Sequence, residues 1–273
     1  MVKTVTLDPH DDAAVLYRKD GDVARITINR PRVRNALNRS VVEGLCATLR
    51  RSIEDRVRVA VIAGAGSTFC AGHDLNESFI EEPRGVDRYY HVQAVNDISR
   101  LIRRCAHPVV ASVAGYALGA GCEIALGCDV VIAEETAEFG FPEISVGLSL
   151  TGGGSKIIHG AVGAIAAKRL ILLGDRFDAP TARRLNLVTL VAPTGELETE
   201  TERVVDRLRS LSPVALTHAK RAIDRAADLT YESAYETEVD TALLLEGNAD
   251  SESAAREFLD RRSNSSADKA EIR

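Results

Sequence analysis

The chain has 273 residues, of which 45% are apolar and 27% are charged, and its formal net charge is −6. This length can bury a sizeable core, in one large domain or in a domain with an appendage, and the composition is that of an ordinary globular protein. The acidic balance argues against nucleic acid as the main partner, because phosphate binding needs a basic stripe. A local basic pocket for a small anionic ligand stays possible.

The N-terminal segment MVKTVTLDPHDD has no apolar signal region, and the five cysteines form no CxxC pair. This pattern predicts a reduced, cytoplasmic protein without a zinc or disulfide framework. The uncharged stretch 105–122 approaches the length of a membrane span, but a histidine, a proline and three glycines divide it into a strand and a turn. We therefore expect a buried core segment there and no membrane partner.

The first elements along the chain read as a hairpin and a helix. Two apolar runs flank Lys19–Asp22, and Asp-Gly between such runs is a hairpin signal. A basic loop over 30–38 precedes an amphipathic helix, which we expect Ser40 to cap. A strand, a glycine-rich turn and a second helix are then expected, at 57–62, 64–72 and 94–105.

The most informative stretch runs from about residue 109 to 143, and two of its glutamates, Glu123 and Glu143, lie near glycine-bearing turns. Val109–Val113 follows a proline and reads as a buried strand, and Gly119-Ala120-Gly121 then leads into a helix that carries Glu123. A strand over 130–133 and a short segment over 139–142 deliver Glu143. Glycines at a helix start let the backbone approach a ligand, and the N–H groups there attract anions. Two glutamates beside such donors indicate acid/base chemistry next to a developing oxyanion.

Strands give way to helices in the last third of the chain. We expect helices over 161–173 and from 179, a strand over 187–191, and helices over 197–211, 213–227, 231–245 and 251–262. This order predicts an α/β core over 1–195 and an all-helical region over 196–273, with a disordered polar tail over 263–273. The apolar side chains of 242–245 either pack back on the core or meet a neighbouring subunit.

Other segments of the chain resemble known functional motifs only in part. The turn over 67–75 is a second glycine-bearing turn, so backbone N–H groups from it and from 115–123 could converge on one carbonyl oxygen, unless both turns only reverse the chain. The segment AVIAGAG at 60–66 lacks the third glycine of a dinucleotide fingerprint, and the chain has no GxxxxGK[ST], HExxH or GxSxG motif. No histidine lies near Cys122 in the sequence, which favours a packed thiol over a nucleophile.

Four motifs, in this order and spacing, carry a family resemblance. They are NALN at 35–38, FCAGHDL at 69–75, GYALGAGCEIALGCD at 115–129 and FGFPEISVGL at 139–148. Together with GDRFDAPTARRLNLVTLVAP at 174–193 and EGNADSESAAREFLDRR at 246–262, they make the chain resemble the enoyl-CoA hydratase/isomerase (crotonase) superfamily. The resemblance covers nearly the whole chain and is greatest to an enoyl-CoA hydratase.

The resemblance implies a fold and a reaction. The fold is an α/β spiral of repeated β-β-α turns with a C-terminal all-helical region that helps to form homotrimers, often paired into hexamers. The substrate is an acyl-CoA thioester whose carbonyl oxygen is held by the backbone N–H groups of His73 and Ala120. Glu123 activates water and Glu143 delivers the proton to the α-carbon, which hydrates a 2-enoyl-CoA to a 3-hydroxyacyl-CoA, as in fatty acid metabolism.

The resemblance also implies further substrate contacts, at Ala36, Ala71, Asp74, Leu75, Asn76, Gly119, Phe141 and Thr151. It implies no metal and no cofactor, since coenzyme A is part of the substrate. Two positions depart from the family pattern. His73 replaces a small residue, so its imidazole lines the pocket or is structural, and Leu150-Thr151 replace Pro-Gly. Thr151 could hydrogen-bond an acyl substituent or cap the following helix.

Two alternatives to a hydratase stay open from the sequence. The first is isomerisation of an enoyl-CoA, or another reaction through an enolate such as decarboxylation or retro-aldol cleavage. The second is a non-catalytic scaffold that binds acyl-CoA. Two retained glutamates argue against the scaffold, because water addition needs both a base for the water and an acid for the carbon.

Overall fold

The structure is a computed structural model that describes residues 13–76, 85–247, 252–253, 256 and 259. The helix expected over 251–262 and the tail over 263–273 therefore lie largely or wholly outside the described residues. The chain divides into two compact units, Met1–Val205 and Asp206–Arg273. The division falls inside α7 (Leu197–Arg209), the first helix of the region predicted to be all-helical.

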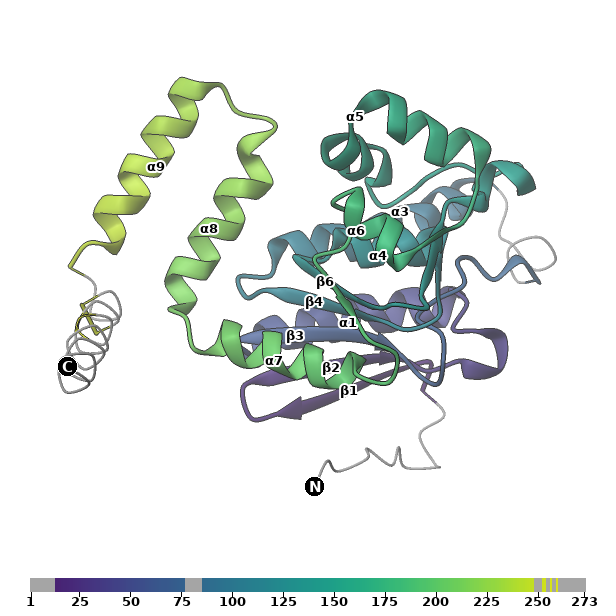
Figure 1. Ribbon diagram of the computed structural model, residues 1–273, viewed down its shortest axis with the longest axis horizontal. Helices are drawn as coiled ribbons and strands as arrows, with labels where there is room; N and C mark the ends of the chain where they lie inside the picture. Colours follow the sequence, from purple (N-terminus) through teal and green to yellow (C-terminus); the bar gives the residue numbers. More distant parts are fainter. Residues whose placement is uncertain (1–12, 77–84, 248–251, 254–255, 257–258, 260–273) are drawn as a thin grey trace, which may run out of the picture. The chain divides into compact units, whose positions relative to one another are not determined.

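The first unit is built on a six-stranded sheet with the spatial order β1-β2-β3-β4-β6-β9 (Figure 1). β1 and β2 form the predicted antiparallel hairpin, which turns through Gly21 at φ +61°. All later neighbours in this sheet pair parallel. The six strands span Val15–Asp20, Val23–Ile28, Val59–Gly64, Val109–Val113, Val130–Glu134 and Leu190–Ala192.

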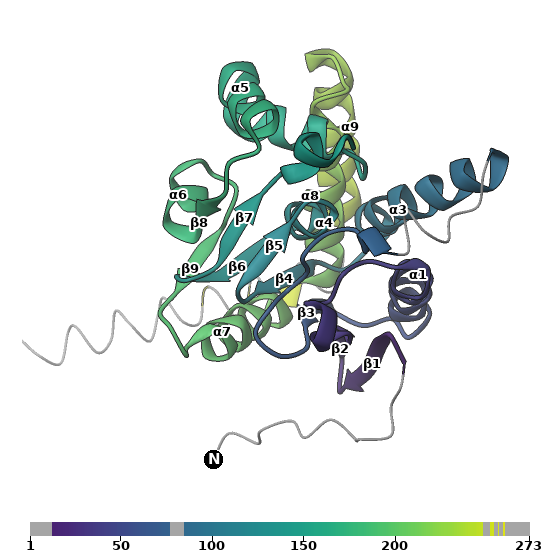
Figure 2. The same cartoon turned by 90° about the vertical axis from the view of Figure 1, so that its right-hand side faces the viewer.

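Side-chain alternation assigns the two faces of this sheet. Every second residue of the central strands joins the hydrophobic core with α1 (Arg39–Glu54) and α3 (Val86–Arg104). The opposite face is covered by α7, where Arg25 makes two hydrogen bonds of 2.6 Å to Glu202 and the Ser112 hydroxyl lies 3.0 Å from that of Thr201. Figure 2 shows α1 and α7 on opposite sides of the strands.

A second, three-stranded sheet lies beside the first and has the order β5-β7-β8. Its strands span Tyr116–Leu118, Glu138–Gly140 and Phe177–Asp178. β4 and β6 are each followed by a strand of this sheet and then by a helical segment, which is the predicted β-β-α repeat. Successive repeats meet closely at Gly115, where φ is +54° and a Cβ would overlap the carbonyl oxygen of Ser67.

The remaining helices of the first unit are η1 (Pro31–Val33), α4 (Ala120–Gly127), η2 (Pro142–Val146), α5 (Gly154–Leu173) and α6 (Ala179–Arg184). Among them, α4, α5 and α6 were expected, whereas the short 3-10 helices η1 and η2 were not. α5 begins at Gly154 rather than at 161, and its backbone breaks at Gly163 with φ +77° and ψ 167°. Glycine-rich sequence weakens the local helix signal, so packing sets this boundary.

The predicted cap of α1 was wrong. Ser40 already lies inside the helix, and the N-cap is Asn38, whose extended backbone (φ −104°, ψ 179°) lets its side chain accept a hydrogen bond of 3.0 Å from the N–H of Val41. Both residues are common caps, and the backbone angles of the preceding loop decide between them. α3 likewise begins at Val86, earlier than the expected 94.

The described part of the second unit consists mainly of α8 (Pro213–Ala226) and α9 (Tyr231–Leu245), which form a helical hairpin (Figure 1). Ser212 and Thr230 cap the two helices through their hydroxyl groups. α9 matches its predicted bounds. Tyr231, Tyr235, Val239 and Leu243 are exposed and spaced four residues apart, which places them on one face of α9.

Candidate active site

Two buried glutamates mark the candidate site. Glu123 lies in the first turn of α4 and is 2% exposed, and Glu143 lies in the first turn of η2 and is 6% exposed. The adjacent β5 and β7, which precede α4 and η2, bring them together although they are distant in sequence. Buried carboxylates are rare without a pairing partner, so their environments indicate what each can do.

Both carboxylate oxygens of Glu123 accept hydrogen bonds from one residue. The N–H of Thr151 donates to Oε1 at 2.7 Å, and the Thr151 hydroxyl donates to Oε2 at 2.8 Å. The glycine turn after Thr151 packs directly on the same carboxylate, because a Cβ on Gly154 would lie 2.5 Å from Oε1. Glu123 is therefore held in one orientation.

Glu143 has the opposite environment. Neither of its carboxylate oxygens has a hydrogen-bond partner among the described residues, although both are buried. The carboxyl group lies over Gly119, since a Cβ added there would be 3.2 Å from Glu143 Oε1. An unpartnered buried carboxyl group favours its neutral, protonated form, because burial penalises the charge.

The pKa values of both groups are raised. Burial raises the pKa of Glu123 to about 7, and the hydrogen bond from the Thr151 hydroxyl opposes the rise; Glu143 adds a smaller upward contribution only when it is ionised. Burial also raises the pKa of Glu143, whose side chain has no comparable hydrogen bond. One carboxyl group held by donors and another held by none can serve as base and acid near neutral pH.

Two glycine turns meet beside these carboxyl groups. A Cβ on Gly119 would lie 3.8 Å from the Cα of Gly72, and a Cβ on Gly72 would lie 3.0 Å from the carbonyl oxygen of Leu118. The residue after each glycine is a predicted oxyanion donor, His73 or Ala120. The structure thus brings together the two turns that the sequence singled out.

The backbone orients both predicted donors. The bridge between Leu37 and His73 uses the carbonyl of Gly72 and the N–H of Asp74, so the N–H of His73 points away from Leu37. Ala120 is the first residue of α4, where an N–H has no acceptor within the helix. The N–H of Gly119 instead donates to the carbonyl of Gly140 at 2.9 Å, which anchors the turn.

Several predicted substrate contacts gather around one ion pair. Arg30 binds the carboxylate of Asp74 at 2.9 Å and the carbonyl of Ala36 at 2.7 Å. Asp74 also accepts a hydrogen bond of 3.2 Å from the N–H of Asn76, and the N–H of Ala71 donates to the carbonyl of Arg34. Leu75 is 42% exposed at the end of this turn. The two loops form one connected surface next to the glycine turns.

Phe141 and Thr151 complete the predicted set. Phe141 is fully buried, with its ring centroid 6.4 Å from that of Phe177, so its side chain packs in the core. The expectation that Thr151 could cap the following helix is wrong, because the N-cap of α5 is Gly153 and makes no side-chain cap. The Thr151 hydroxyl is engaged by Glu123 instead.

Asn96 was not among the residues predicted for the site. The Asn96 side-chain oxygen accepts a hydrogen bond of 2.7 Å from the N–H of Gly152, which ties the loop after η2 to α3. No local pattern marks this residue, because its partner is 56 residues away in the chain.

Cys122 is fully buried, and burial raises the pKa of its thiol well above the usual value. This favours the prediction of a packed thiol over that of a nucleophile.

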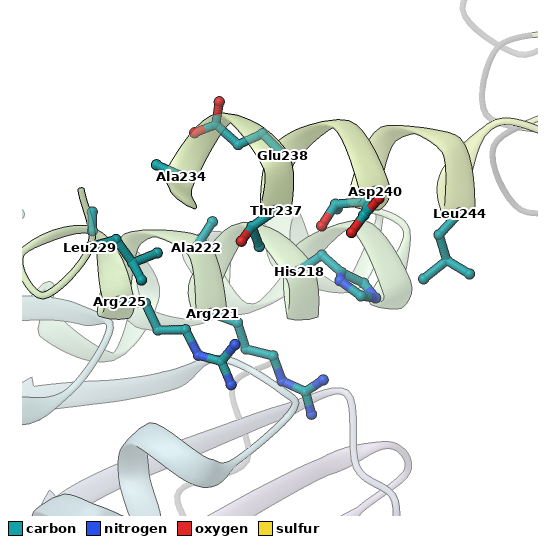
Figure 3. A pocket seen from close by; sticks show the side chains of 12 residues that line it. His218, Arg221, Ala222, Arg225, Leu229, Ala234, Thr237, Glu238, Asp240 and Leu244 are labelled. Carbon is teal, nitrogen blue, oxygen red and sulfur yellow. The ribbon is translucent and has the colours of Figure 1, made fainter. Parts of the chain in front are cut away.

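A separate groove of about 290 Å³ lies between α8 and α9 in the second unit (Figure 3). Its lining includes His218, Thr237 and Leu244, and Figure 3 shows Arg221 and Arg225 extending away from α9. None of the predicted site residues lines it.

Across the described ranges, no cluster of His, Cys, Asp and Glu has a metal-binding arrangement, and no helix is long and apolar enough to cross a bilayer.

Comparison with known proteins assigns the chain to a family. A family model described as enoyl-CoA hydratase/isomerase matches residues 18–269. The chain belongs to this family. This chain is 35% identical to the short-chain-enoyl-CoA hydratase of Clostridium acetobutylicum over 237 residues. The aligned region covers 86% of this chain and 87% of the Clostridium protein.

Solved structures agree with this assignment. The enoyl-CoA hydratase subunit I of Geobacillus kaustophilus has a TM-score of 0.84 and 32% identity, covering 91% of this chain and 95% of that one. A Thermobifida fusca protein in complex with CoA has a TM-score of 0.79 and 28% identity, covering 85% and 92%. The predicted crotonase-like α/β fold is therefore confirmed, and the chain is an enzyme of the enoyl-CoA hydratase/isomerase family.

Proposed function

We propose that this enzyme adds water to a 2-enoyl-CoA to give a 3-hydroxyacyl-CoA, and catalyses the reverse reaction. The observation that carries the proposal is the pair of buried glutamates with unlike environments. Thr151 donates to both oxygens of Glu123, whereas Glu143 has no partner in the described structure. A hydratase needs this difference, because one group must accept a proton while the other donates one.

In the proposed reaction Glu123 removes a proton from water as the water oxygen bonds to the β-carbon. The electron pair of the carbon–carbon double bond moves toward the thioester carbonyl, whose oxygen becomes an enolate. The backbone N–H groups of His73 and Ala120 stabilise that oxygen. Glu143 then gives its proton to the α-carbon and is left ionised. Net transfer of the proton that Glu123 took from water to Glu143, directly or through solvent, returns both glutamates to their starting states. Neither step uses a metal ion or a redox cofactor.

The wider proposal concerns substrate and assembly. The Arg30 loop and residues 71–76 would contact the CoA part, since they form one polar surface beside the glycine turns. The C-terminal helices would join three copies into a trimer, or six into a dimer of trimers. The exposed apolar face of α9 supports this, because such faces are usually covered by a partner.

An absorbance assay tests the proposed reaction. The purified enzyme is mixed with crotonyl-CoA and with a longer 2-enoyl-CoA, and loss of the conjugated-thioester absorbance is followed. We expect loss with at least one substrate and formation of the 3-hydroxyacyl-CoA, identified by mass spectrometry as a gain of one water. A 3-enoyl-CoA that is converted to the 2-enoyl form without any hydration would favour the isomerase alternative.

The pH dependence of hydration follows from the raised pKa values. Glu123 acts as base only when ionised, so kcat/KM, which reports the groups of the free enzyme, should fall as the pH drops through about 7. Glu143 acts as acid only when protonated, and its raised pKa extends this form to higher pH before the rate falls on the alkaline side. Stopped-flow rates across the pH range check this. An acidic limb near the ordinary pKa of a glutamate would contradict the assignment of Glu123.

A further inference from the structure

Thr151 makes a two-point contact with the proposed base. Its N–H donates to Glu123 Oε1 at 2.7 Å, and its hydroxyl donates to Oε2 at 2.8 Å. Because the two donors come from one residue and reach different oxygens, they fix both the position and the plane of the carboxylate.

The loop that carries Thr151 is itself held on two sides. The N–H of Gly152 donates to Asn96 of α3 at 2.7 Å, and Gly152 has φ +57°, a conformation that favours glycine. A Cβ on Gly152 would lie 3.5 Å from the Cβ of Glu123, and one on Gly154 would lie 2.5 Å from Glu123 Oε1. The loop is therefore packed between α3 and the Glu123 side chain, which places both Thr151 donors against the carboxylate.

We propose that Thr151 is the positioning residue of Glu123, and that its hydroxyl orients the carboxylate and favours its ionised form. The inference rests on the proposed role of Glu123 as the base. The hydroxyl is already engaged by Glu123 in the free enzyme, which argues against a main role in binding the acyl group.

The Thr151 hydroxyl matters because of its effect on the charge of the Glu123 carboxylate. Burial favours the neutral form of Glu123, as does Glu143 whenever it is ionised, and the hydrogen bonds from Thr151 are the contacts that oppose this effect. Cys122, the neighbouring titratable group on α4, is a buried neutral thiol and adds no charge. A hydrogen bond to an ionised buried group is stronger than one between neutral groups, so its removal should raise the proton affinity of Glu123.

The test compares three variants. Thr151→Val keeps the shape and the N–H but removes the hydroxyl, and Thr151→Ser keeps the hydroxyl. Thr48→Val is the matched control, because the 9% exposed Thr48 also loses a hydroxyl bonded at 2.9 Å, to Gly44 inside α1. If Thr151→Val does not fold, Thr151→Ala takes its place in the comparison with Thr151→Ser.

We expect Thr151→Val to lower kcat at neutral pH about tenfold to a hundredfold, with KM nearly unchanged. The acidic limb of kcat/KM should move up by about one pH unit, so that part of the rate returns at higher pH. Thr151→Ser should restore both properties, and Thr48→Val should leave the limb in place. A loss of rate that is equal at every pH, or that Thr151→Ser does not restore, overturns the proposal.

A measurement without turnover separates this proposal from the proposed reaction. Infrared titration of the Glu123 carboxylate, taken as the difference between each protein and its Glu123→Gln counterpart, gives the protonation midpoint directly. A higher midpoint in Thr151→Val supports the positioning role even if no 2-enoyl-CoA is hydrated, in which case the proposed reaction alone fails. An unchanged midpoint overturns the positioning role even in an active hydratase.

Discussion

Replacing either Glu123 or Glu143 by glutamine should reduce the rate of hydration by about 10²–10⁴-fold, the range for loss of a general acid or base. Glutamine has nearly the same shape but can neither take a proton from water nor give one to carbon at neutral pH. The two variants should fail alike, because addition of water needs both transfers. Loss of the conjugated-thioester absorbance measures the rate.

The controls for these variants are a binding measurement and an exposed glutamate. Titration calorimetry with a non-reactive acyl-CoA should show affinity within about threefold of the parent protein, since the carboxyl groups act in the transition state rather than in uniform binding. Glu54→Gln, at the exposed end of α1, should keep full activity. If one glutamine variant keeps nearly full activity, a single-base reaction such as isomerisation becomes the better assignment.

Replacing Gly119 by alanine should also nearly abolish activity. Gly119 has φ +53° and ψ −129°, which an L-amino acid with a side chain adopts only under strain, and its added Cβ would lie 3.2 Å from Glu143 Oε1. The strain moves the first turn of α4, and with it the N–H of Ala120. Loss of one oxyanion donor typically lowers kcat by about 10²–10³-fold.

Gly160→Ala is the matched control for this substitution. Gly160 lies within α5, has an ordinary negative φ, and a Cβ there would meet nothing within 4 Å. Alanine is the better helix former, so this variant should keep full activity and equal or higher thermal stability. Circular dichroism melting curves of both variants separate loss of the fold from loss of the donor. A fully active Gly119→Ala enzyme would exclude Ala120 as an oxyanion donor.

The core elements were predictable because their signals are local. β4 follows a proline as an apolar run interrupted only by Ser112, and its predicted bounds match the observed ones, Val109–Val113. α4 follows a glycine turn with an acidic residue in its first turn, and the structure places it at Ala120–Gly127. Buried parallel strands form nearly continuous apolar segments in the sequence, so composition and periodicity are enough to predict them.

The errors lie where distant contacts set a boundary. α5 begins at Gly154 because that backbone packs on Glu123, a contact that glycine-rich sequence cannot reveal. Asn38 rather than Ser40 caps α1 because the loop before it is extended at Asn38. Helix ends are the least predictable part of a fold, since several residues compete to cap them and tertiary packing chooses one.

The repeated pattern of strands and glycine turns, the family and the two candidate glutamates could all be predicted from the sequence. The unlike surroundings of the two glutamates could not be predicted, because they depend on contacts made in the folded chain. Glu123 meets its two donors on Thr151, 28 residues later in the chain, and Glu143 meets no donor among the described residues. Hydrogen bonds between distant segments depend on how the whole chain packs, and burial then magnifies their effect on charge.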